Sequence, residues 1–290
     1  MTALTIRQIK TQIQQMTSEE AISPLPSFWI TDWLLHVINK SALFLITDES
    51  YELTEDEQKQ FNAGVVKMKQ GTPLAYLTGQ QAFWSLNFTV NEHTLIPRPD
   101  TEILIEQVLN WISDQPTHTC GKRLLDLGTG SGCIAISLAH ELKKDNWQVV
   151  AVDLSSEALN VAQHNAVFNE VTNIEFVQSS WYDKLSTQDT PLFDIIVSNP
   201  PYIDEADEHL ARLVAEPISA LSAPNHGLAD IEHIVQQATH YLCKGGLLAI
   251  EHGYDQGRAV RQLFLDNGFG SVSTVQDYGG NDRVTLGQGC

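Results

Sequence analysis

A chain of 290 residues, 42% of them hydrophobic, is long enough to form one large or two modest domains with a packed core. Its 36 acidic residues outnumber its 17 lysines and arginines, and the net charge of −19 disfavours a DNA or RNA substrate, because nucleic acid binding depends on neutralising phosphates. The same excess of acid would attract a basic protein partner.

The N-terminus and the cysteines indicate the cellular location of the protein and the kinds of site to expect in it. Residues 1–10 lack the pattern of a secretion signal, and no apolar run approaches membrane-spanning length, so we expect a cytoplasmic protein without membrane contact. The four cysteines have no paired spacing, which predicts neither a zinc site nor a disulfide framework; they are Cys120, Cys133, Cys243 and Cys290.

The first part of the chain is predicted to be helical. Apolar residues recur at helical spacing over residues 4–13, and two further helical stretches follow over residues 28–38 and 53–68. Prolines and a glycine separate these stretches, at Pro24, Pro26, Gly71 and Pro73. Residues 1–80 are therefore expected to form a small helical domain.

A β-hairpin is expected to connect this domain to the rest of the chain. Residues 83–90 and 93–96 have the composition of strands and are separated by Asn91 and Glu92. We assign residues 81–98 to this hairpin linker.

Strands and helices alternate in the remaining domain, residues 99–290. This alternation predicts a doubly wound α/β fold with a mostly parallel sheet that helices cover on both faces. The last two expected strands lie near residues 271–276 and 283–286, joined by a turn at residues 277–282, and are expected to form an antiparallel edge.

A glycine-rich loop follows the first apolar strand of this domain. The strand at residues 124–127 runs into Gly128, Thr129, Gly130, Ser131 and Gly132, and then into a helical pattern. Glycine permits the tight turn and lets a ligand touch the backbone. The spacing is shorter than that of dinucleotide-binding loops, which hold a pyrophosphate. It resembles the loop of class I methyltransferases, which implies that these five residues bind S-adenosylmethionine.

Two later residues are candidates for the same ligand. The strand at residues 147–153 ends in Asp153, whose carboxylate could accept both hydroxyls of a ribose. An Asp at a strand end can instead cap the next helix, but the position of Asp153 in the strand order favours the ribose. Trp181 is a candidate wall for the adenine.

A stiff turn, Asn199-Pro200-Pro201-Tyr202, follows the apolar strand at residues 193–198. Each proline fixes its own φ and removes a backbone donor, so the carbonyls stay free to accept. The Asn199 side-chain oxygen and the Pro200 carbonyl can converge on the hydrogens of a planar NH2 group, and the Tyr202 ring can lie against its face. The turn predicts a pocket for an amide or amino nitrogen, although a proline turn can also merely close a strand.

The candidate residues share one edge of the expected sheet. Gly128, Asp153, Trp181 and Asn199 fall at or just beyond the C-terminal ends of successive strands. Open α/β sheets bind ligands in the crevice at that edge. We therefore expect one site, in which Asn199 also contacts the cofactor.

Three further stretches extend the resemblance to a family. They are Leu-Ile-Pro-Arg-Pro-Asp-Thr-Glu at 95–102, Glu-Pro-Ile-Ser-Ala-Leu at 216–221 and Gly-Gly-Leu-Leu-Ala-Ile-Glu at 245–251. With the Asn-Pro-Pro-Tyr turn, they resemble the peptide chain release factor glutamine methyltransferase family from about Gly71 onward. The resemblance implies a seven-stranded class I methyltransferase sheet and an N-terminal helical domain that recognises the substrate.

The resemblance also implies the reaction. A methyl group would pass from S-adenosylmethionine, leaving S-adenosylhomocysteine, to the side-chain amide of the glutamine in the Gly-Gly-Gln motif of class I release factors. Asn199, Pro200 and Tyr202 would be the catalytic residues, and with Pro201 they would hold the substrate amide. No metal and no direct nucleic acid contact are expected, and we expect a monomer.

Two positions differ from the family pattern. His252 stands where the family usually has Ile, and Ser180 stands where it more often has Asp. The second change leaves open how the adenine amino group is bound.

Three other functions are compatible with these motifs. One is a glutamine methyltransferase of a large-subunit ribosomal protein, from which the stretch at 98–102 separates this chain. Another is an exocyclic-amine methyltransferase of a nucleic acid, which the charge disfavours. A third is a non-catalytic S-adenosylmethionine-binding regulator, against which the intact turn argues.

Acidic residues follow the turn directly. Residues 204–208, Asp-Glu-Ala-Asp-Glu, would lie near the mouth of the expected site and could steer a basic substrate. A solvated loop that keeps the protein in solution is an equal alternative.

Overall fold

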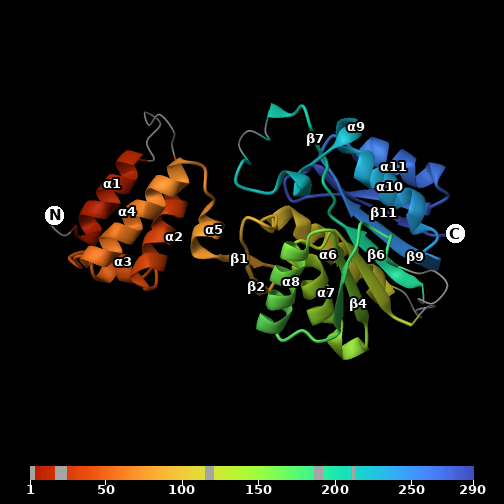
Figure 1. The fold of residues 1–290 in the computed structure, drawn as a ribbon, viewed down its shortest axis with the longest axis horizontal. Helices are drawn as coiled ribbons and strands as arrows, with labels where there is room; N and C mark the ends of the chain where they lie inside the picture. The colour runs from red at the N-terminus through yellow and green to blue at the C-terminus, as the bar shows by residue number, and fades with distance from the viewer. Residues whose placement is uncertain (1–3, 17–24, 115–120, 186–191, 209, 211–212) are drawn as a thin grey trace. The chain divides into compact units, whose positions relative to one another are not determined.

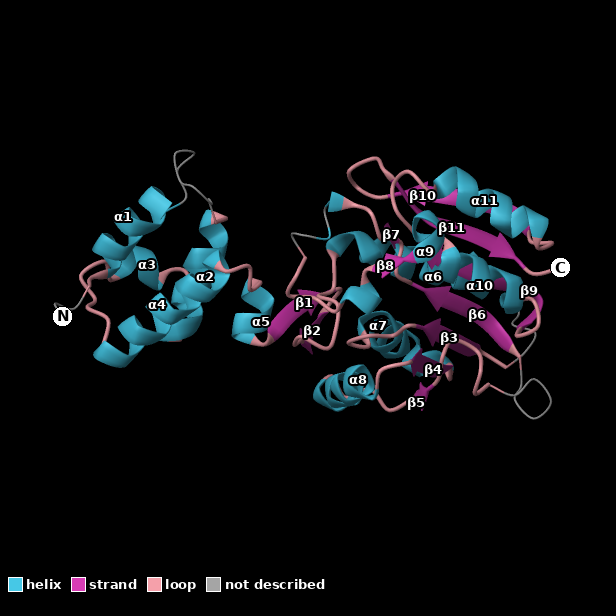
Figure 2. Ribbon diagram, turned by 45° about the horizontal axis from the view of Figure 1, so that its top comes forward, coloured by secondary structure: helices cyan, strands magenta, loops and turns pink. Residues whose placement is uncertain are grey.

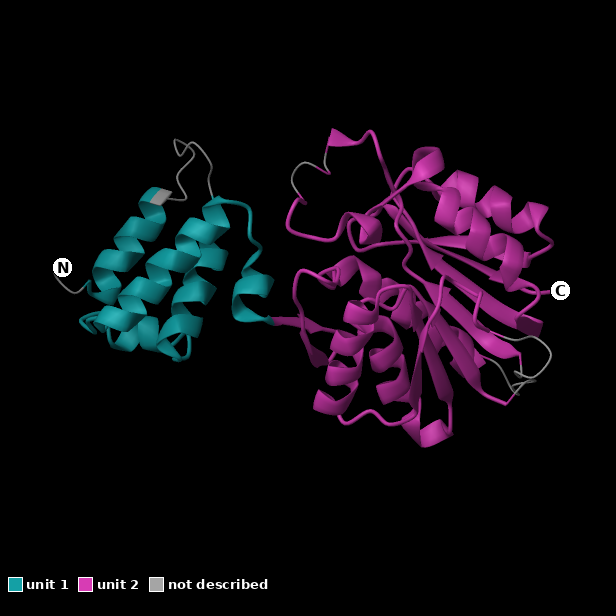
Figure 3. Cartoon of the chain, viewed as in Figure 1, with its two compact units in different colours: residues 1–79 teal, residues 80–290 magenta. Residues whose placement is uncertain are grey.

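The computed structural model describes residues 4–16, 25–114, 121–185, 192–208, 210 and 213–290. The chain forms two compact units, residues 1–79 and residues 80–290 (Figure 3). Among the described residues, none of the helices combines the length and the apolar character that crossing a membrane requires.

The first unit is helical (Figure 1). Its elements are α1 (Ile6–Met16), α2 (Ser27–Ile38), α3 (Phe44–Thr47), α4 (Glu55–Lys69) and α5 (Leu74–Thr78). Ile6, Ile9 and Ile13 recur along one face of α1 and are buried together with apolar residues of α2 and α4. The three predicted helical stretches are confirmed, whereas α3 and α5 are too short to show a periodic pattern in the sequence.

A capping box fixes the start of helix α4, and a glycine near its middle lets it pack closely against α2. Its capping box joins the Thr54 hydroxyl to the Glu57 N–H at 3.2 Å and the Glu57 carboxylate to the Thr54 N–H at 2.7 Å. At Gly64 an added Cβ would lie 2.2 Å from the Trp33 indole, so only glycine allows this approach of α2 and α4.

The second unit begins with the expected hairpin, but its strands differ from the prediction. β1 (Gln80–Phe83) pairs antiparallel with β2 (Leu86–Thr89), and residues 93–96 are not a strand. The turn falls at Trp84, whose φ of 55° is left-handed and whose N–H donates to Glu102 at 2.7 Å. Asn91, expected in the turn, instead accepts from the His93 N–H in a local side-chain turn.

A seven-stranded sheet forms the centre of the second unit (Figure 2). Its strands are β3 (Arg123–Leu127), β4 (Gln148–Asp153), β5 (Ile174–Gln178), β6 (Phe193–Ser198), β9 (Leu242–Glu251), β10 (Gly270–Gln276) and β11 (Asp282–Gln288). Their spatial order is β10-β11-β9-β6-β3-β4-β5, and β11 runs antiparallel to both neighbours. The predicted mostly parallel sheet and its antiparallel pair are confirmed.

Helices cover both faces of the sheet (Figure 1). On one face lie α6 (Glu102–Asp114), α7 (Cys133–Leu142) and α8 (Ser156–Phe168), and on the other lie α10 (Ala229–Ala238) and α11 (Gly257–Asp266). Neighbouring residues of one strand enter opposite cores: Leu124 packs in the first and Leu125 in the second. Burial on both faces explains why these strands read as continuous apolar runs.

Short elements complete the second unit. β7 (Ile203–Asp204) pairs parallel with β8 (Ser222–Ala223), and α9 (Pro224–Gly227) follows. Short 3₁₀ turns include η1 (Pro99–Thr101), η2 (Lys143–Asp145) and η4 (Ile218–Ala220). Cys243 on β9 is in a disulfide, whereas Cys133 and Cys290 are free. The sequence indicated no disulfide, because cysteines that meet through the fold have no characteristic spacing.

Candidate active site

A cavity of about 380 Å³ lies at the C-terminal ends of the central strands. Its size falls in the usual range for small-molecule sites. Eight of the predicted site residues line it: Gly128, Thr129, Gly130, Ser131, Asp153, Trp181, Asn199 and Pro201. Gly132, Pro200 and Tyr202 are not among the lining residues. The crevice of the sheet therefore brings together most of the candidates.

The glycine loop is held against the neighbouring strand. The N–H groups of Gly128 and Thr129 both donate to the Val152 carbonyl at 2.9 Å. Gly128 has a φ of 76°, and a Cβ there would meet the Trp181 ring at 3.3 Å. Glycine at this position thus lets Trp181 lie close over the loop.

Gly132 serves packing. It precedes α7 with a φ of 82°, and a Cβ there would lie 2.6 Å from Ile136 of the same helix. This position explains why it does not line the cavity, and a direct contact with the cofactor stays a prediction.

Asp153 lies on the cavity and orders the backbone around it. One carboxylate oxygen accepts from the Gly130 N–H at 2.8 Å, and the other accepts from the Ser155 N–H at 2.9 Å. Burial raises the pKa of Asp153, and backbone N–H donors partly offset that rise. The cap of α8 is Ser155, whose hydroxyl accepts from the Ala158 N–H at 3.1 Å. The capping role considered for Asp153 thus belongs to Ser155.

Asp126 is a buried acid that sequence reasoning missed. It lies on β3 just before the glycine loop, and its Oδ2 accepts from the Thr129 hydroxyl at 2.6 Å. Its Oδ1 has no hydrogen-bond partner among the described residues, and burial raises its pKa to about 7. A lone acid inside an apolar strand was the available signal.

The Trp181 wall has a polar neighbour that was also missed. Asp230 of α10 lines the same cavity. Burial raises the pKa of Asp230, and the Trp181 side chain offsets part of that rise.

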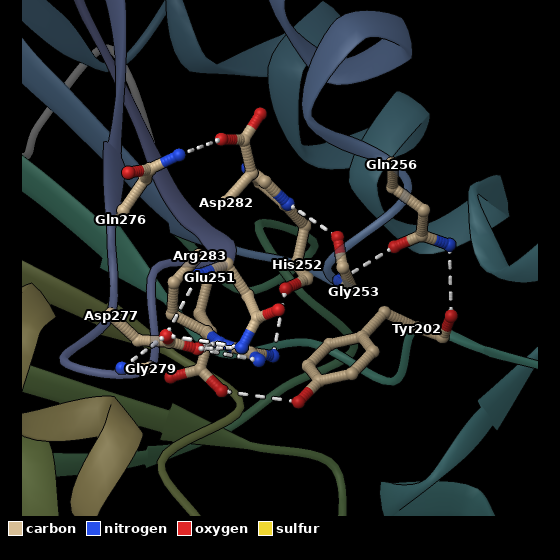
Figure 4. A network of polar contacts seen from close by, with 11 residues as sticks. Tyr202, Glu251, His252, Gly253, Gln256, Gln276, Asp277, Gly279, Asp282 and Arg283 are labelled. Carbon is tan, nitrogen blue, oxygen red and sulfur yellow. Dashed lines mark hydrogen bonds and ion pairs between the residues drawn. The ribbon is translucent and has the colours of Figure 1, made fainter.

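The Asn-Pro-Pro-Tyr turn is anchored through two side chains that sequence reasoning did not single out. Asn199 Nδ2 donates to the Thr101 hydroxyl at 3.2 Å, and among the described residues nothing donates to its Oδ1. The Tyr202 hydroxyl donates to Glu251 at 3.2 Å (Figure 4). Thr101 and Glu251 lie within the stretches that carried the family resemblance, but their partners depend on the fold.

Comparison with known proteins decides the family. A family model described as a methyltransferase domain matches residues 118–278, and the PrmC N-terminal domain matches residues 23–79. The chain is 44% identical over 257 residues to the release factor glutamine methyltransferase of Escherichia coli, covering 88% of this chain and 89% of that protein. The chain belongs to the release factor glutamine methyltransferase family.

Other members of the release factor glutamine methyltransferase family show similar coverage. The protein of that name from Aliivibrio fischeri is 42% identical over 97% of this chain and 95% of its own length. Among solved structures, the hMettl16 catalytic domain has a TM-score of 0.55 at 16% identity and covers 90% of each chain. A methyltransferase from Pyrococcus furiosus has a TM-score of 0.50 at 16% identity and covers 82% of this chain and 100% of its own. These two likenesses establish the fold.

Two of the family stretches meet at the cavity wall. Glu216 is buried, and its carboxylate accepts from the Ile96 N–H at 3.0 Å and pairs with Arg98 at 2.5 Å. Leu95, Pro97 and Arg98 line the cavity on one side of this pair, and Pro217 and Ser219 line it on the other. Glu216 thus joins two wall segments that are far apart in the sequence.

The two departures from the family pattern lie in different places. Ser180 lines the cavity. His252 is fully buried beside β11, where one ring nitrogen contacts the Gly253 carbonyl at 2.9 Å and the other contacts the Thr285 hydroxyl at 2.8 Å. His252 therefore has a packing role between strands.

The acidic loop after the turn is outside the cavity lining. Its first residue, Asp204, pairs with His226 at 2.7 Å, whereas Glu205 and Glu208 are exposed. A steering role for this loop stays a prediction.

Proposed function

We propose that this protein transfers a methyl group from S-adenosylmethionine to the side-chain amide nitrogen of the Gly-Gly-Gln glutamine in class I release factors. Its relatives at 42–45% identity carry the name release factor glutamine methyltransferase, which supports the substrate class. The observation that carries the chemistry is Asn199, which lies on the cavity with its Nδ2 held by Thr101 and its Oδ1 free to accept.

The cavity has the polar groups that S-adenosylmethionine requires. Ser131 Oγ is buried on the lining without a hydrogen-bond partner in the described structure. Gly130 has no atom within 4 Å of the place where a Cβ would stand, which leaves a cradle beside the backbone. Asp153 would hold the ribose, because each carboxylate oxygen can accept more than the one bond that it makes here. Trp181 offers a flat face for the adenine.

The residues of the turn would orient the substrate amide. When bound, S-adenosylmethionine supplies an electrophilic methyl group on its sulfonium. A glutamine amide nitrogen is a poor nucleophile because its lone pair is delocalised into the carbonyl. Asn199 Oδ1, on the cavity, would accept one of its hydrogens, and the carbonyl of the adjacent Pro200, which is not a lining residue, would accept the other. These contacts would fix the nitrogen and stabilise the positive charge that develops on it. The extra proton then leaves to water, and the amide regains its neutral form.

Residues 1–80 would recognise the release factor. The match of residues 23–79 to a domain that accompanies the methyltransferase domain in this family supports that role. Residues 81–98 would act as the linker and residues 99–290 as the catalytic domain. We propose that the protein acts as a monomer in the cytoplasm, where it would meet its substrate without touching nucleic acid.

Mass spectrometry tests the substrate directly. Purified release factor is incubated with this protein and S-adenosylmethionine, and the Gly-Gly-Gln peptide is expected to gain one methyl group. A release factor with alanine in place of that glutamine is the control and should gain none. If the methyl group appears on another residue, the substrate assignment fails while the cofactor assignment stands. If wild-type release factor stays unmodified, the proposed reaction is wrong.

A further inference from the structure

Both ends of the Asn-Pro-Pro-Tyr turn lead to one buried carboxyl group. Glu251 is the last residue of β9, is 1% exposed, and accepts from the Tyr202 hydroxyl at 3.2 Å through Oε1 (Figure 4). At the other end of the turn, Asn199 donates to the Thr101 hydroxyl, which interacts with the same carboxyl group. Glu251 itself does not line the cavity, so it lies behind Thr101 and Asn199.

A cation on the neighbouring strand interacts electrostatically with this carboxyl group. Arg283 of β11 lies beside Glu251, donates to Asp277 at 2.9 and 3.2 Å and donates to the His252 carbonyl at 3.2 Å. Arg283 is thus already oriented by other groups. Its charge can stabilise Glu251 without reorganisation.

A buried carboxyl group at this position is expected to lower the stability of the fold. Oε2 of Glu251 has no hydrogen-bond partner among the described residues, and a buried unpaired oxygen costs stability. Burial raises the pKa of Glu251 to about 7, opposed by Thr101, Arg283 and Tyr202 and reinforced by Asp100. A destabilising acid next to a ligand cavity is a common mark of function.

We propose that Glu251 is a positioning residue for methyl transfer, which holds Tyr202 and Thr101 so that Asn199 keeps its oxygen toward the substrate amide. The proposal rests on the proposed function of the turn. It assigns Tyr202 to anchoring the turn from behind, in addition to the substrate contact predicted for its ring.

The backbone of the turn has a separate anchor, which makes the proposal testable. Gln256 donates to the Tyr202 carbonyl at 2.9 Å and to the His226 carbonyl at 2.9 Å. Gly227 packs so closely on the Tyr202 carbonyl that a Cβ would lie 1.9 Å away. Tyr202→Phe should therefore keep the fold of the turn and lose the interactions of the hydroxyl with Glu251 and Arg283.

Kinetics of conservative variants form the first test. Glu251→Gln keeps the shape and an acceptor for Tyr202 but removes the charge. We expect kcat to fall about 10- to 100-fold, with KM for the release factor and the Kd for S-adenosylmethionine changed less than about threefold. Tyr202→Phe should lower kcat similarly, and the double variant should lose no more than the worse single variant, because the two residues act as one unit.

Asp194→Asn is the matched control. Asp194 is also a buried acid, but it lies at the start of β6 and so at the opposite end of the strands from the cavity. The substitution should leave kcat within about threefold of wild type. Near-wild-type kcat in both Glu251→Gln and Tyr202→Phe would overturn the proposal. A loss in Glu251→Gln no larger than that of the control would overturn it as well.

A second readout needs no substrate. The side-chain amide signals of Asn199 in ¹⁵N NMR should shift as the pH passes through about 7 in the wild type, and this shift should be smaller in Glu251→Gln. Asp126 has a pKa near the same value, and it remains in both proteins, so the difference between them reports Glu251. Identical titrations would overturn the positioning role. If release factor is not methylated at all, the proposed function fails while this titration still decides the role of Glu251.

Discussion

At the scale of single residues, the site combines two half-buried acceptors on the cavity with two acids that are fully buried. Asn199 and Asp153 reach the cavity, whereas Asp126 and Glu251 carry their charge inside the protein. The first pair should determine catalysis and ligand affinity. The second pair should make stability and geometry depend on pH.

Asn199→Ala should lose most of the methyl transfer and keep its affinity for S-adenosylmethionine. The variant removes the side-chain acceptor and leaves the Pro200 carbonyl, and loss of one such oriented contact typically costs about 10²- to 10³-fold in rate. Single-turnover kinetics with both substrates saturating measures this step. Asn199→Asp should also be slow, because its charge would stand beside the sulfonium. A near-wild-type rate for Asn199→Ala would contradict the mechanism.

Asp153→Ala should weaken S-adenosylmethionine binding by about 2 to 3 kcal/mol, because the ribose hydroxyls would lose charge-assisted acceptors. Calorimetric titration measures the affinity. Ser155→Ala is the control, since it removes the α8 cap without touching that carboxylate. Equal affinity in wild type and Asp153→Ala would show that the carboxylate only orders Gly130 and Ser155.

The unfolding free energy should fall as the pH rises from about 4 to about 7. Burial lifts the pKa of Asp126 from 3.8 to about 7, so the folded state holds a proton that the unfolded state has released. This contribution to the unfolding free energy is fully present below the pKa of Asp126 in the unfolded chain, and it is lost as the pH rises to the pKa of Asp126 in the folded protein. In Asp126→Asn, the difference in unfolding free energy between about pH 4 and about pH 8 should be smaller than in the wild type by ~2 to 4 kcal/mol. Urea unfolding at several pH values measures it, and parallel curves would rule out this titration.

At the scale of elements, the strands were the most predictable part of the fold. Runs such as residues 124–127 and 193–198 place apolar side chains on both faces of the sheet, with Asp126, Asp194 and Ser198 as the exceptions, so their sequence alone identifies them as strands. The hairpin was misplaced because its turn uses Trp84 in a left-handed conformation, which no sequence rule favours. Thr101 and Glu251 stood in recognised stretches, but their contacts are made across distant segments that only the fold brings together.

Arg98→Ala should destabilise the second unit by about 1 to 3 kcal/mol, because it leaves the buried Glu216 carboxylate with only the Ile96 N–H. Arg98 is 39% exposed, which keeps the expected loss below that of a fully buried pair. Arg261→Ala breaks a more exposed pair with Asp282 and should cost at most about 1 kcal/mol. Chemical denaturation compares the two. Equal losses would mean that the Glu216 contact does not hold the cavity wall together.

At the scale of the whole molecule, the net charge of −19 gives an electrostatic field that acts before any contact forms. The comparison with relatives favours a protein partner, and the acidic loop is close in sequence to the turn. Within that loop Asp204 is paired with His226, and Glu205 and Glu208 are two exposed acids on which the steering role can be tested.

Neutralising Glu205 and Glu208 to glutamine should lower the association rate with the release factor and flatten its dependence on salt, with the chemical step unchanged. The matched control neutralises Glu170 and Glu175, which are exposed beside the start of β5 at the opposite edge of the sheet. Stopped-flow binding at several ionic strengths measures both. The same salt slope in the two double variants would leave the loop as a solvated surface.

The order of strands in the sheet has a consequence for how the protein is made. β11 is synthesised after β9 and β10, yet it lies between them. Until it inserts, β9 has an open edge, β10 has no neighbour in the sheet, and Arg283 is missing from the side of Glu251. An open edge of this kind invites pairing with other chains. During synthesis, the nascent chain therefore lacks a finished site and is most exposed to aggregation just before β11 emerges.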